Sequence, residues 1–216
     1  MKRLIGCCAF VASTLAVPAA GQTPDRTLVF AEAGVGGVPY PLGNSGCGDG
    51  SGAFTLSAGV GRGVGSRLEL VGRGTVMPRF VLAHCAETLV PRPPGEYHDR
   101  IFDPTVADGV LPSVDTQLRL RSGARRGVEA RAGAGLALSH TALPFVAAGI
   151  GARLGGRLGV TIGAEARAFR VPYDERHSVI REDPPSYEER TTGSGATWKT
   201  GWFLVLGIAP VAGEGP

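Results

Sequence analysis

Residues 157–169 read RLGVTIGAEARAF, in which apolar residues alternate with polar or small ones. One side of this stretch carries only Leu, Val, Ile and Ala, whereas the other carries every charge, including Glu165 and Arg167. Successive side chains of a β-strand point to opposite faces, so this period of two predicts a strand with two chemically different faces. The fold has to provide a separate environment for each face.

The same alternation recurs along most of the chain. In residues 126–139, for example, Val and Ala positions alternate with Glu129, Arg131 and glycines. No apolar run approaches the roughly 18 residues that a membrane-spanning helix needs. The pattern predicts eight strands, at residues 27–35, 52–64, 66–78, 114–122, 126–139, 143–154, 157–171 and 197–210.

The connections between these strands alternate in length. Tight turns of glycine and basic residues are expected around residues 65, 122–125 and 155–156, whereas long connections are expected at 36–51, 79–113 and 172–196, with a short exception at 139–142. An even number of antiparallel strands with short turns at one end and longer loops at the other is typical of membrane barrels. We therefore predict an all-β, eight-stranded, antiparallel up-and-down transmembrane β-barrel over residues 22–210.

The charged face is expected to point into this barrel. Arg or Lys on the lipid face costs on the order of 2–4 kcal/mol at the membrane midplane, and the apolar faces contain neither. An eight-stranded barrel is just wide enough for side chains to fill it, so we expect a plugged polar core with no wide pore. The predicted interior charge network comprises Glu69, Arg73, Arg119, Arg121, Glu129, Arg131, Arg153, Glu165 and Arg167, together with Arg67 and Glu32.

Two details of this assignment depend on phase. Placing Glu32 inside puts Val29 on the lipid face and Phe30 in the lumen, so the register of the first strand is an open prediction. Trp198 and Trp202, with Tyr173, are the aromatic residues expected at a membrane interface.

Periodicity alone does not say which face of the strands lies inside the barrel. The alternative to a membrane barrel is therefore a soluble exported barrel, similar to a lipocalin, with the charges in solvent and an apolar ligand inside.

Both ends of the chain lie outside the predicted barrel. Lys2 and Arg3, a short apolar core at 4–17 and small residues up to Gly21 predict a cleaved signal peptide over residues 1–21, with cleavage after Ala19 as an alternative. Residues 211–216 form a short tail. Removing the signal removes two of the four cysteines and leaves the pair Cys47 and Cys85. In an oxidising compartment these two are a disulfide candidate, and two free loop thiols are the alternative.

Signal peptide, eight alternating strands and loop parity together resemble the small outer-membrane β-barrel family of OmpA/OmpX type. The stretch KTGWFLVL, with Lys199, Gly201, Leu204 and Leu206, also looks like the last-strand assembly signal of such barrels, although Pro210 and six further residues follow it. The resemblance implies residence in the cell outer membrane, with membrane lipid and the barrel assembly machinery as partners. The net charge of +3 does not suggest a nucleic-acid partner.

Fold does not transfer function, so the chemistry of individual residues has to be considered separately. His84, His98, His140 and His177 all fall in or beside predicted outer connections. Ser139 and His140 are adjacent and would point to opposite strand faces, and His84 beside Cys85 lacks a second spaced pair of metal ligands. We expect no catalytic residue, metal or cofactor, and we interpret the charged residues 173–190 as a solvated outer loop.

The function expected from the sequence is therefore non-enzymatic: a structural outer-membrane barrel, or one whose loops bind an extracellular ligand. Loops on a rigid scaffold are where binding residues concentrate. The lipocalin-like barrel is the second hypothesis. A lipid A-modifying enzyme is the third, and it would require a serine and histidine pair at the lipid-facing rim.

Overall fold

The protein is described here by a computed structural model, which covers residues 27–38, 51–64, 67–80, 86–88, 96–102, 109–122, 126–138, 142–155, 158–182 and 185–210. The predicted signal peptide, the C-terminal tail, Cys47 and Cys85 lie outside these residues. The described strands are β1 (Thr27–Val38), β2 (Ser51–Gly63), β3 (Leu68–Phe80), β4 (Ala86–Thr88), β5 (Glu96–Ile101), β6 (Gly109–Arg121), β7 (Gly127–Ala137), β8 (Leu143–Leu154), β9 (Leu158–Glu182) and β10 (Pro185–Pro210).

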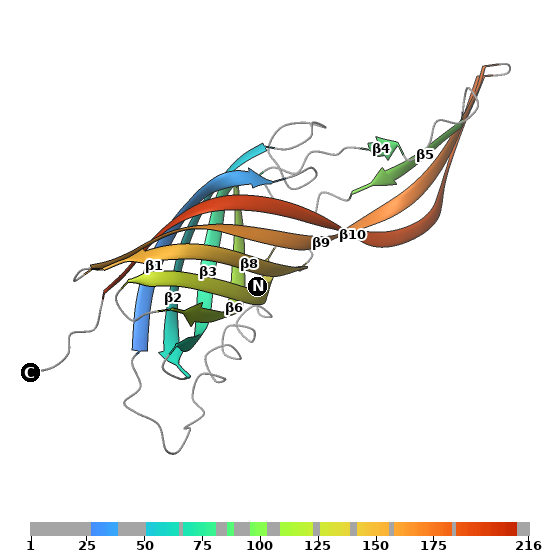
Figure 1. The fold of residues 1–216 in the computed structure, drawn as a ribbon. Coiled ribbons are helices and arrows are strands. Elements are labelled where there is room, and N and C mark those ends of the chain that lie inside the picture. The colour runs from blue at the N-terminus through green and yellow to red at the C-terminus, as the bar shows by residue number, and fades with distance from the viewer. Residues whose placement is uncertain are drawn as a thin grey trace, which may run out of the picture.

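Eight of these strands close into a ring in the order β1-β2-β3-β6-β7-β8-β9-β10 (Figure 1). Every neighbouring pair is antiparallel, and the ring is closed by pairing of β1 with β10 from Ala31↔Ile208 to Gly37↔Trp202. Closure leaves no open edge around the barrel wall, which satisfies the backbone groups of the ring strands. The prediction of an eight-stranded antiparallel up-and-down β-barrel is confirmed.

Short connections of a few residues join β2 to β3, β6 to β7 and β8 to β9 at one end of the barrel, here called the turn end. In the β6–β7 turn, the Val128 N–H donates to Ser122 Oγ (2.8 Å) and the Ser122 N–H donates to the Val128 carbonyl (2.9 Å). Gly127, between them, has a φ of 151°, a conformation that favours glycine.

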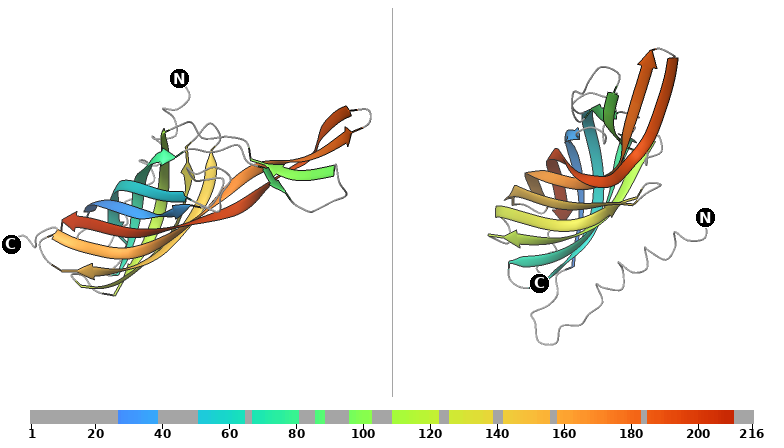
Figure 2. Two further views of the ribbon diagram at one scale, coloured as in Figure 1. Left: turned by 90° about the horizontal axis from the view of Figure 1, so that it is seen from above. Right: turned by 90° about the vertical axis from the view of Figure 1, so that its right-hand side faces the viewer.

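Strands β9 and β10 run far beyond the ring at the other end, the arm end. Their pairing continues from Ala196↔Pro172 to Pro185↔Glu182, with a bulge between Thr191 and Gly193. Strand β5 pairs with the outer part of β9, and β4 pairs with β5. These four strands form a projecting sheet, which we call the arm (Figures 1 and 2).

The arm corrects two expectations, because residues 172–196 and part of 79–113 were predicted to be loops. The described parts of both segments contain regular strands instead. Once β9 and β10 are paired in the barrel, extending the hairpin adds cross-strand hydrogen bonds without a further loop-closure cost, so the pairing continues into the charged segment.

The two faces of the barrel wall differ as the alternation predicts. Outward side chains are apolar and exposed, as for Ile150 (67%) and Leu204 (67%), whereas inward side chains are buried, as for Arg167 (1%). Glu32 and Phe30 point inward and Val29 points outward, which gives the first strand the register considered in the sequence analysis. Charges are therefore inside and apolar side chains are outside.

Candidate functional site

The centre of the lumen is organised around Arg73, whose side chain is fully buried. Its guanidinium donates to Asp115 Oδ1 through Nε (3.0 Å), to Glu165 Oε1 through Nη2 (2.8 Å) and to Glu32 Oε2 through Nη1 (3.3 Å). These carboxylates come from β6, β9 and β1, so one side chain on β3 joins four strands across the barrel.

Glu32 and Glu165 extend the network to other strands. Glu32 Oε1 accepts hydrogen bonds from Arg119 Nη2 (3.0 Å) and Arg131 Nη1 (3.0 Å). Glu165 Oε1 accepts one from Arg167 Nε (2.6 Å), and Arg131 Nε lies 3.3 Å from Glu165 Oε2. Charge-assisted bonds of this kind are stronger than neutral ones, and Glu32 and Glu165 are each compensated by three arginines.

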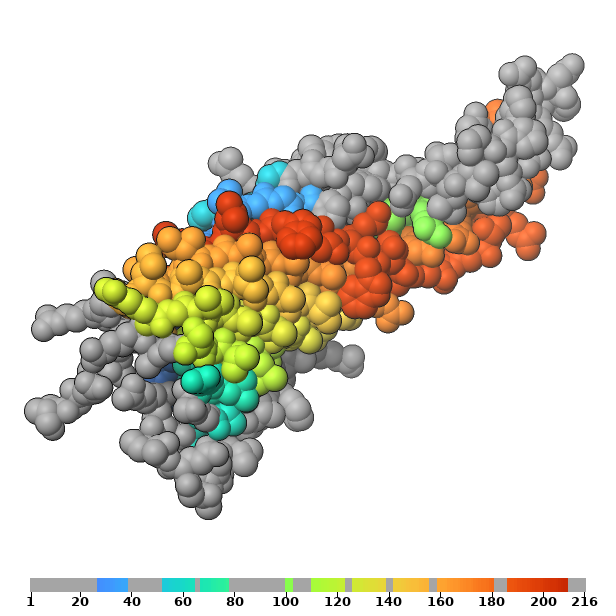
Figure 3. Space-filling model, viewed as in Figure 1, coloured from blue at the N-terminus to red at the C-terminus, as the bar shows by residue number. Residues whose placement is uncertain are grey.

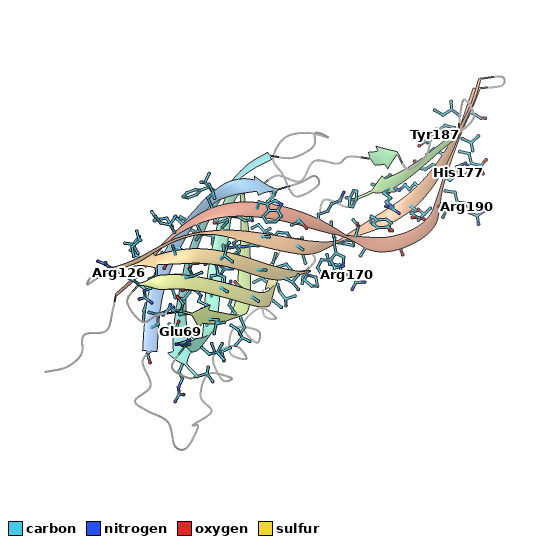
Figure 4. The ribbon with its side chains drawn as sticks, viewed as in Figure 1. Glu69, Arg126, Arg170, His177, Tyr187 and Arg190 are labelled. Carbon is cyan, nitrogen blue, oxygen red and sulfur yellow. The ribbon has the colours of Figure 1, made fainter. Side chains whose placement is uncertain are left out.

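A second group of charges lies at the turn end of the lumen. Arg121 donates to Glu69 through Nη1 and to Glu129 through Nε (3.0 Å). Arg119 Nη1 lies 3.8 Å from Glu129 Oε1, which links this group to the central network. Arg153 is buried beside it, and Figure 4 labels Glu69 at this end. Together the two groups are called the lumen network.

All nine residues proposed from the sequence for the interior charge network point into the barrel. Arg67 does not: it is exposed at the β2–β3 turn, where the strand pairing has already ended and its side chain reaches solvent. Asp115 was missed, although it lies in phase with Gln117 and Arg119 on β6. That phase is the signal that could have identified it.

Two glycines make room for the arginines of the lumen network. A Cβ atom at Gly149 would lie 2.9 Å from Arg131 Nε, and one at Gly159 would lie 2.7 Å from Arg153 Nη2. The guanidinium groups therefore occupy space that any larger residue would fill. The inward glycines and the arginines therefore pack against each other, each glycine leaving the space that a guanidinium group occupies.

Apolar side chains fill the lumen above the charges, at the arm end. Phe145 and Phe169 pack with ring centroids 5.3 Å apart, and Phe102, which follows β5, is only 1% exposed. At the turn end, Phe30 stacks under the Arg119 guanidinium at 4.1 Å. Buried side chains therefore lie in the lumen at the arm end, at the centre and at the turn end. The arm-end cluster contains Val38, Met77, Phe102, Leu111, Ala137, Leu143, Phe145, Ala147, Phe169, Val171, Phe203 and Val205.

Phe102 also connects the barrel to the arm. Its ring meets Tyr173 edge-on at 5.9 Å, and the Lys199 ammonium lies 5.3 Å from the Phe102 ring centroid. Arg100 stacks over Tyr173 at 4.6 Å and lies 3.6 Å from Glu175. Tyr173 therefore packs on the lumen core rather than in the membrane belt expected from the sequence.

Polar contacts hold the outer part of the arm together. Arg176 Nη1 donates to Glu189 Oε1 (2.7 Å), and the Tyr187 hydroxyl donates to Glu189 Oε2 (2.8 Å). The hydrogen bonds from Tyr187 and Arg176 hold the pKa of the Glu189 carboxyl below its ordinary value. Figure 4 shows Tyr187, His177 and Arg190 on the arm, and Figure 3 shows β9 and β10 extending from the barrel as orange and red atoms.

The histidines are distributed differently from the sequence expectation. His84 and His140, with Ser139, lie outside the described residues, whereas the β5–β9 register places His98 opposite His177. The sequence contains no signal for this pairing, because the two residues are far apart along the chain. The described ranges contain no group of three or more His, Cys, Asp or Glu residues arranged to hold a metal ion.

The residues of the proposed assembly signal lie on β10. Leu204 and Leu206 point outward, while Gly201 is buried and the half-buried Lys199 faces the arm-end lumen. Trp198 and Trp202 are exposed on the outer wall near the arm end. No helix in the described part of the chain is both long and apolar enough to cross a membrane.

The outer wall has a shallow depression of about 750 Å³ over β10, β1, β2, β3 and β6. It is lined mostly by outward residues, and the strand register aligns Ala31, Ala58 and Gly74 in one row across it. Larger side chains, Leu56 and Leu206, border this row. The depression belongs to the same uncharged surface as the rest of the wall.

Comparison with known proteins adds little to this geometry. No family model matches the chain, and no curated protein matches it. One similar solved structure is the solid-state NMR structure of outer membrane protein AlkL in DMPC lipid bilayers. It has 13% sequence identity, the match covers 93% of this chain and 98% of that chain, and the TM-score is 0.33. A likeness at this level carries no argument about function.

Proposed function

We propose that this protein is a non-enzymatic outer-membrane β-barrel that anchors the arm outside the cell, where the arm binds a ligand. The observation that carries the proposal is the arm itself. Strands β9 and β10 continue well past the ring as a regular sheet that takes no part in closing the barrel. Long outer connections of membrane barrels lie on the extracellular side, and rigidly held outer segments are common binding elements.

The distribution of charge supports a membrane location. Among the described residues of the ring strands, the outward charges are Arg62 and Arg170, close to opposite ends of the wall. Arginines at such positions can extend along the apolar surface and keep their charge in the interface. A soluble barrel such as a lipocalin would need the reverse arrangement, with apolar side chains inside and charges in water.

The lumen supports an anchoring role rather than transport. The lumen network spans the central part of the barrel, and the arm-end cluster, which includes Phe102, occupies the arm end of the lumen. Buried arginines such as Arg73 are bonded to carboxylates from several strands, so opening a wide path would break many contacts together. We therefore infer a barrel without a wide pore.

The proposal is tested by expressing the full chain with its proposed signal and separating inner from outer membranes. The outer fraction is run on a detergent gel with and without boiling, and protease is added to intact cells. We expect a band that shifts on heating, and cleavage within residues 172–196 in whole cells. Recovery as soluble periplasmic protein without a heat shift would contradict the membrane barrel and favour the lipocalin-like alternative.

A further inference from the structure

The two edges of the arm sheet differ in length. In the order β4-β5-β9-β10, one edge is β4, which is only 3 residues long. The other edge is β10, whose pairing with β1 ends at Trp202. From Pro185 to Trp198, no described strand pairs with the side of β10 that faces away from β9. Figures 1 and 2 show β10 on the margin of the arm opposite β5.

This edge lacks most of the features that usually protect exposed strands. Natural edge strands are kept from pairing by short length, charged side chains, proline or a bulge. Between Arg190 and Lys199, β10 reads TTGSGATW, without a charge or a proline. The one irregularity in it is the bulge between Thr191 and Gly193, at the far end of the stretch. Residues 193–198 therefore form an uninterrupted edge, which we call the free edge.

The side chains of the free edge also leave room for another strand. Ser194, Ala196 and Trp198 are exposed on one face, and the other face begins with Gly193 and Gly195. The small residues give an added strand access to the backbone. Trp198, which is 54% exposed, provides an aromatic surface beside Ala196 for a large apolar side chain.

The free edge continues an interface that the fold already uses. Strand β1 pairs with this same side of β10 up to Trp202, so a strand on the free edge would lie further along the side of β10 that β1 already uses. Main-chain hydrogen bonds to an exposed sheet edge give affinity for any extended peptide, and the neighbouring side chains give selectivity. An uncharged edge favours an uncharged partner, since no side chain between Arg190 and Lys199 would compensate a buried charge.

We propose that the free edge of β10 binds an extended, uncharged segment of a partner polypeptide by adding it as a strand beside Gly193–Trp198. This inference rests on the proposed function of the arm, and it defines the chemistry of the ligand. Recognition uses backbone hydrogen bonds together with one large apolar side chain that packs against Trp198.

The test uses the full chain folded in lipid nanodiscs and a short fluorescent peptide of alternating threonine and valine with blocked ends. Fluorescence anisotropy measures binding, and amide hydrogen exchange locates it. We expect binding that slows exchange at Gly193–Trp198 and not elsewhere on the arm. The same peptide N-methylated at every residue cannot donate backbone hydrogen bonds and should not bind. Equal binding of both peptides, or no protection of the free edge, would overturn the proposal.

A variant pair separates the free edge from the rest of the arm. Ser194→Lys with Ala196→Lys places two charges on the edge, and we expect about tenfold weaker binding, from two lost cross-strand pairs. Ser186→Lys, on the same strand near the tip, is the matched control and should bind normally. Unchanged binding by the double variant would overturn the proposal.

Each preparation is also run on the heat-shift gel. Wild-type protein that shifts on heating but fails to bind the peptide overturns the strand-addition proposal alone. Wild-type protein that does not shift contradicts the membrane barrel, and with it both proposals. The exchange experiment on wild-type protein remains decisive if the double variant does not fold.

Discussion

Arg73 shows how a single residue can couple distant parts of this barrel. Its side chain is fully buried and bonded to carboxylates from three other strands. Among the ion pairs of the described residues, Asp115 has Arg73 as its partner, and the charge of Arg167 acts on it from further away. A buried carboxylate that loses its partner is expensive, because the protein interior solvates charge poorly.

Arg73→Ala should therefore destabilise the barrel by about 3–5 kcal/mol. The measurement is equilibrium unfolding in urea with lipid vesicles present, followed by the fluorescence of the two tryptophans. Arg126→Ala is the matched control, since Arg126 is exposed at the turn end, and its effect should stay within about 0.5 kcal/mol. Equal stability of the two variants would mean that the lumen network contributes little.

The outer wall gives a second prediction at the scale of the residue. Ile150 lies in the middle of β8 and Leu154 at its turn end, and both are exposed on the outer wall. In a bilayer, Ile150→Arg should cost about 2–4 kcal/mol, whereas Leu154→Arg should cost about 0–1 kcal/mol near the interface. The same unfolding experiment measures both variants. Small and equal costs would indicate that this wall faces water.

At the scale of the element, the outer halves of β9 and β10 are joined by contacts that respond to pH. Glu189 accepts hydrogen bonds from Tyr187 and Arg176, which lower its pKa from the ordinary value of 4.5. Because the folded arm favours the ionised form, this contribution to stability is fully present above pH 4.5. It is lost as the pH falls through the lowered pKa.

An NMR titration of the Glu189 side-chain carbon should thus give a midpoint below 4.5. Arg176→Ala should move the midpoint upward, because it removes one of the two donors. Arg190→Ala, which alters a nearby arm residue outside this contact, should leave it unchanged. A wild-type midpoint at the ordinary value would mean that the contact does not form in solution.

Elements also differ in how well the sequence predicts them. The part of β9 in the ring can be predicted from the sequence, because its lipid-facing side must be apolar and its lumen-facing side is polar, as Ala166 and Arg167 illustrate. The part of β9 in the arm cannot be predicted in this way. Both of its faces meet water and carry charge, as at Arg176 and Glu175, so apolar and polar residues do not alternate. The pairing of β5 with β9 leaves no local signal either. The alternation along each strand was enough to predict which residues point into the lumen. Which of them pair with one another depends on how the strands are arranged in the closed barrel, and the sequence does not show this.

The whole molecule consists of two parts with different requirements. The ring is specified by strand pairing from β1 to β10 and by the lumen network, and neither uses residues 174–194. Phe102 and Tyr173 join the arm to the lumen core, but both lie at or below the start of the arm. The barrel should therefore fold without the outer part of its longest hairpin.

Replacing residues 174–194 by an Asn-Gly turn, which suits a tight hairpin, should preserve the heat shift on a detergent gel. Deleting the single residue Val205 is the control, because a shift of one position moves the following side chains of β10 to the wrong faces. That variant should lose the heat shift. If the shortened protein loses it as well, the arm is required for folding and is not an independent binding element.

The position of Glu32 has a consequence for the timing of folding. It lies on the first strand, and the arginines that donate to it are 41, 87 and 99 positions further along the chain. Its own strand must also pair with the last strand before the ring is complete. Contacts between such distant residues form late and make folding slow. A chain halted before β10 would therefore be left with a carboxylate on an open sheet edge, so closure of the ring and neutralisation of its interior should occur in a single late step.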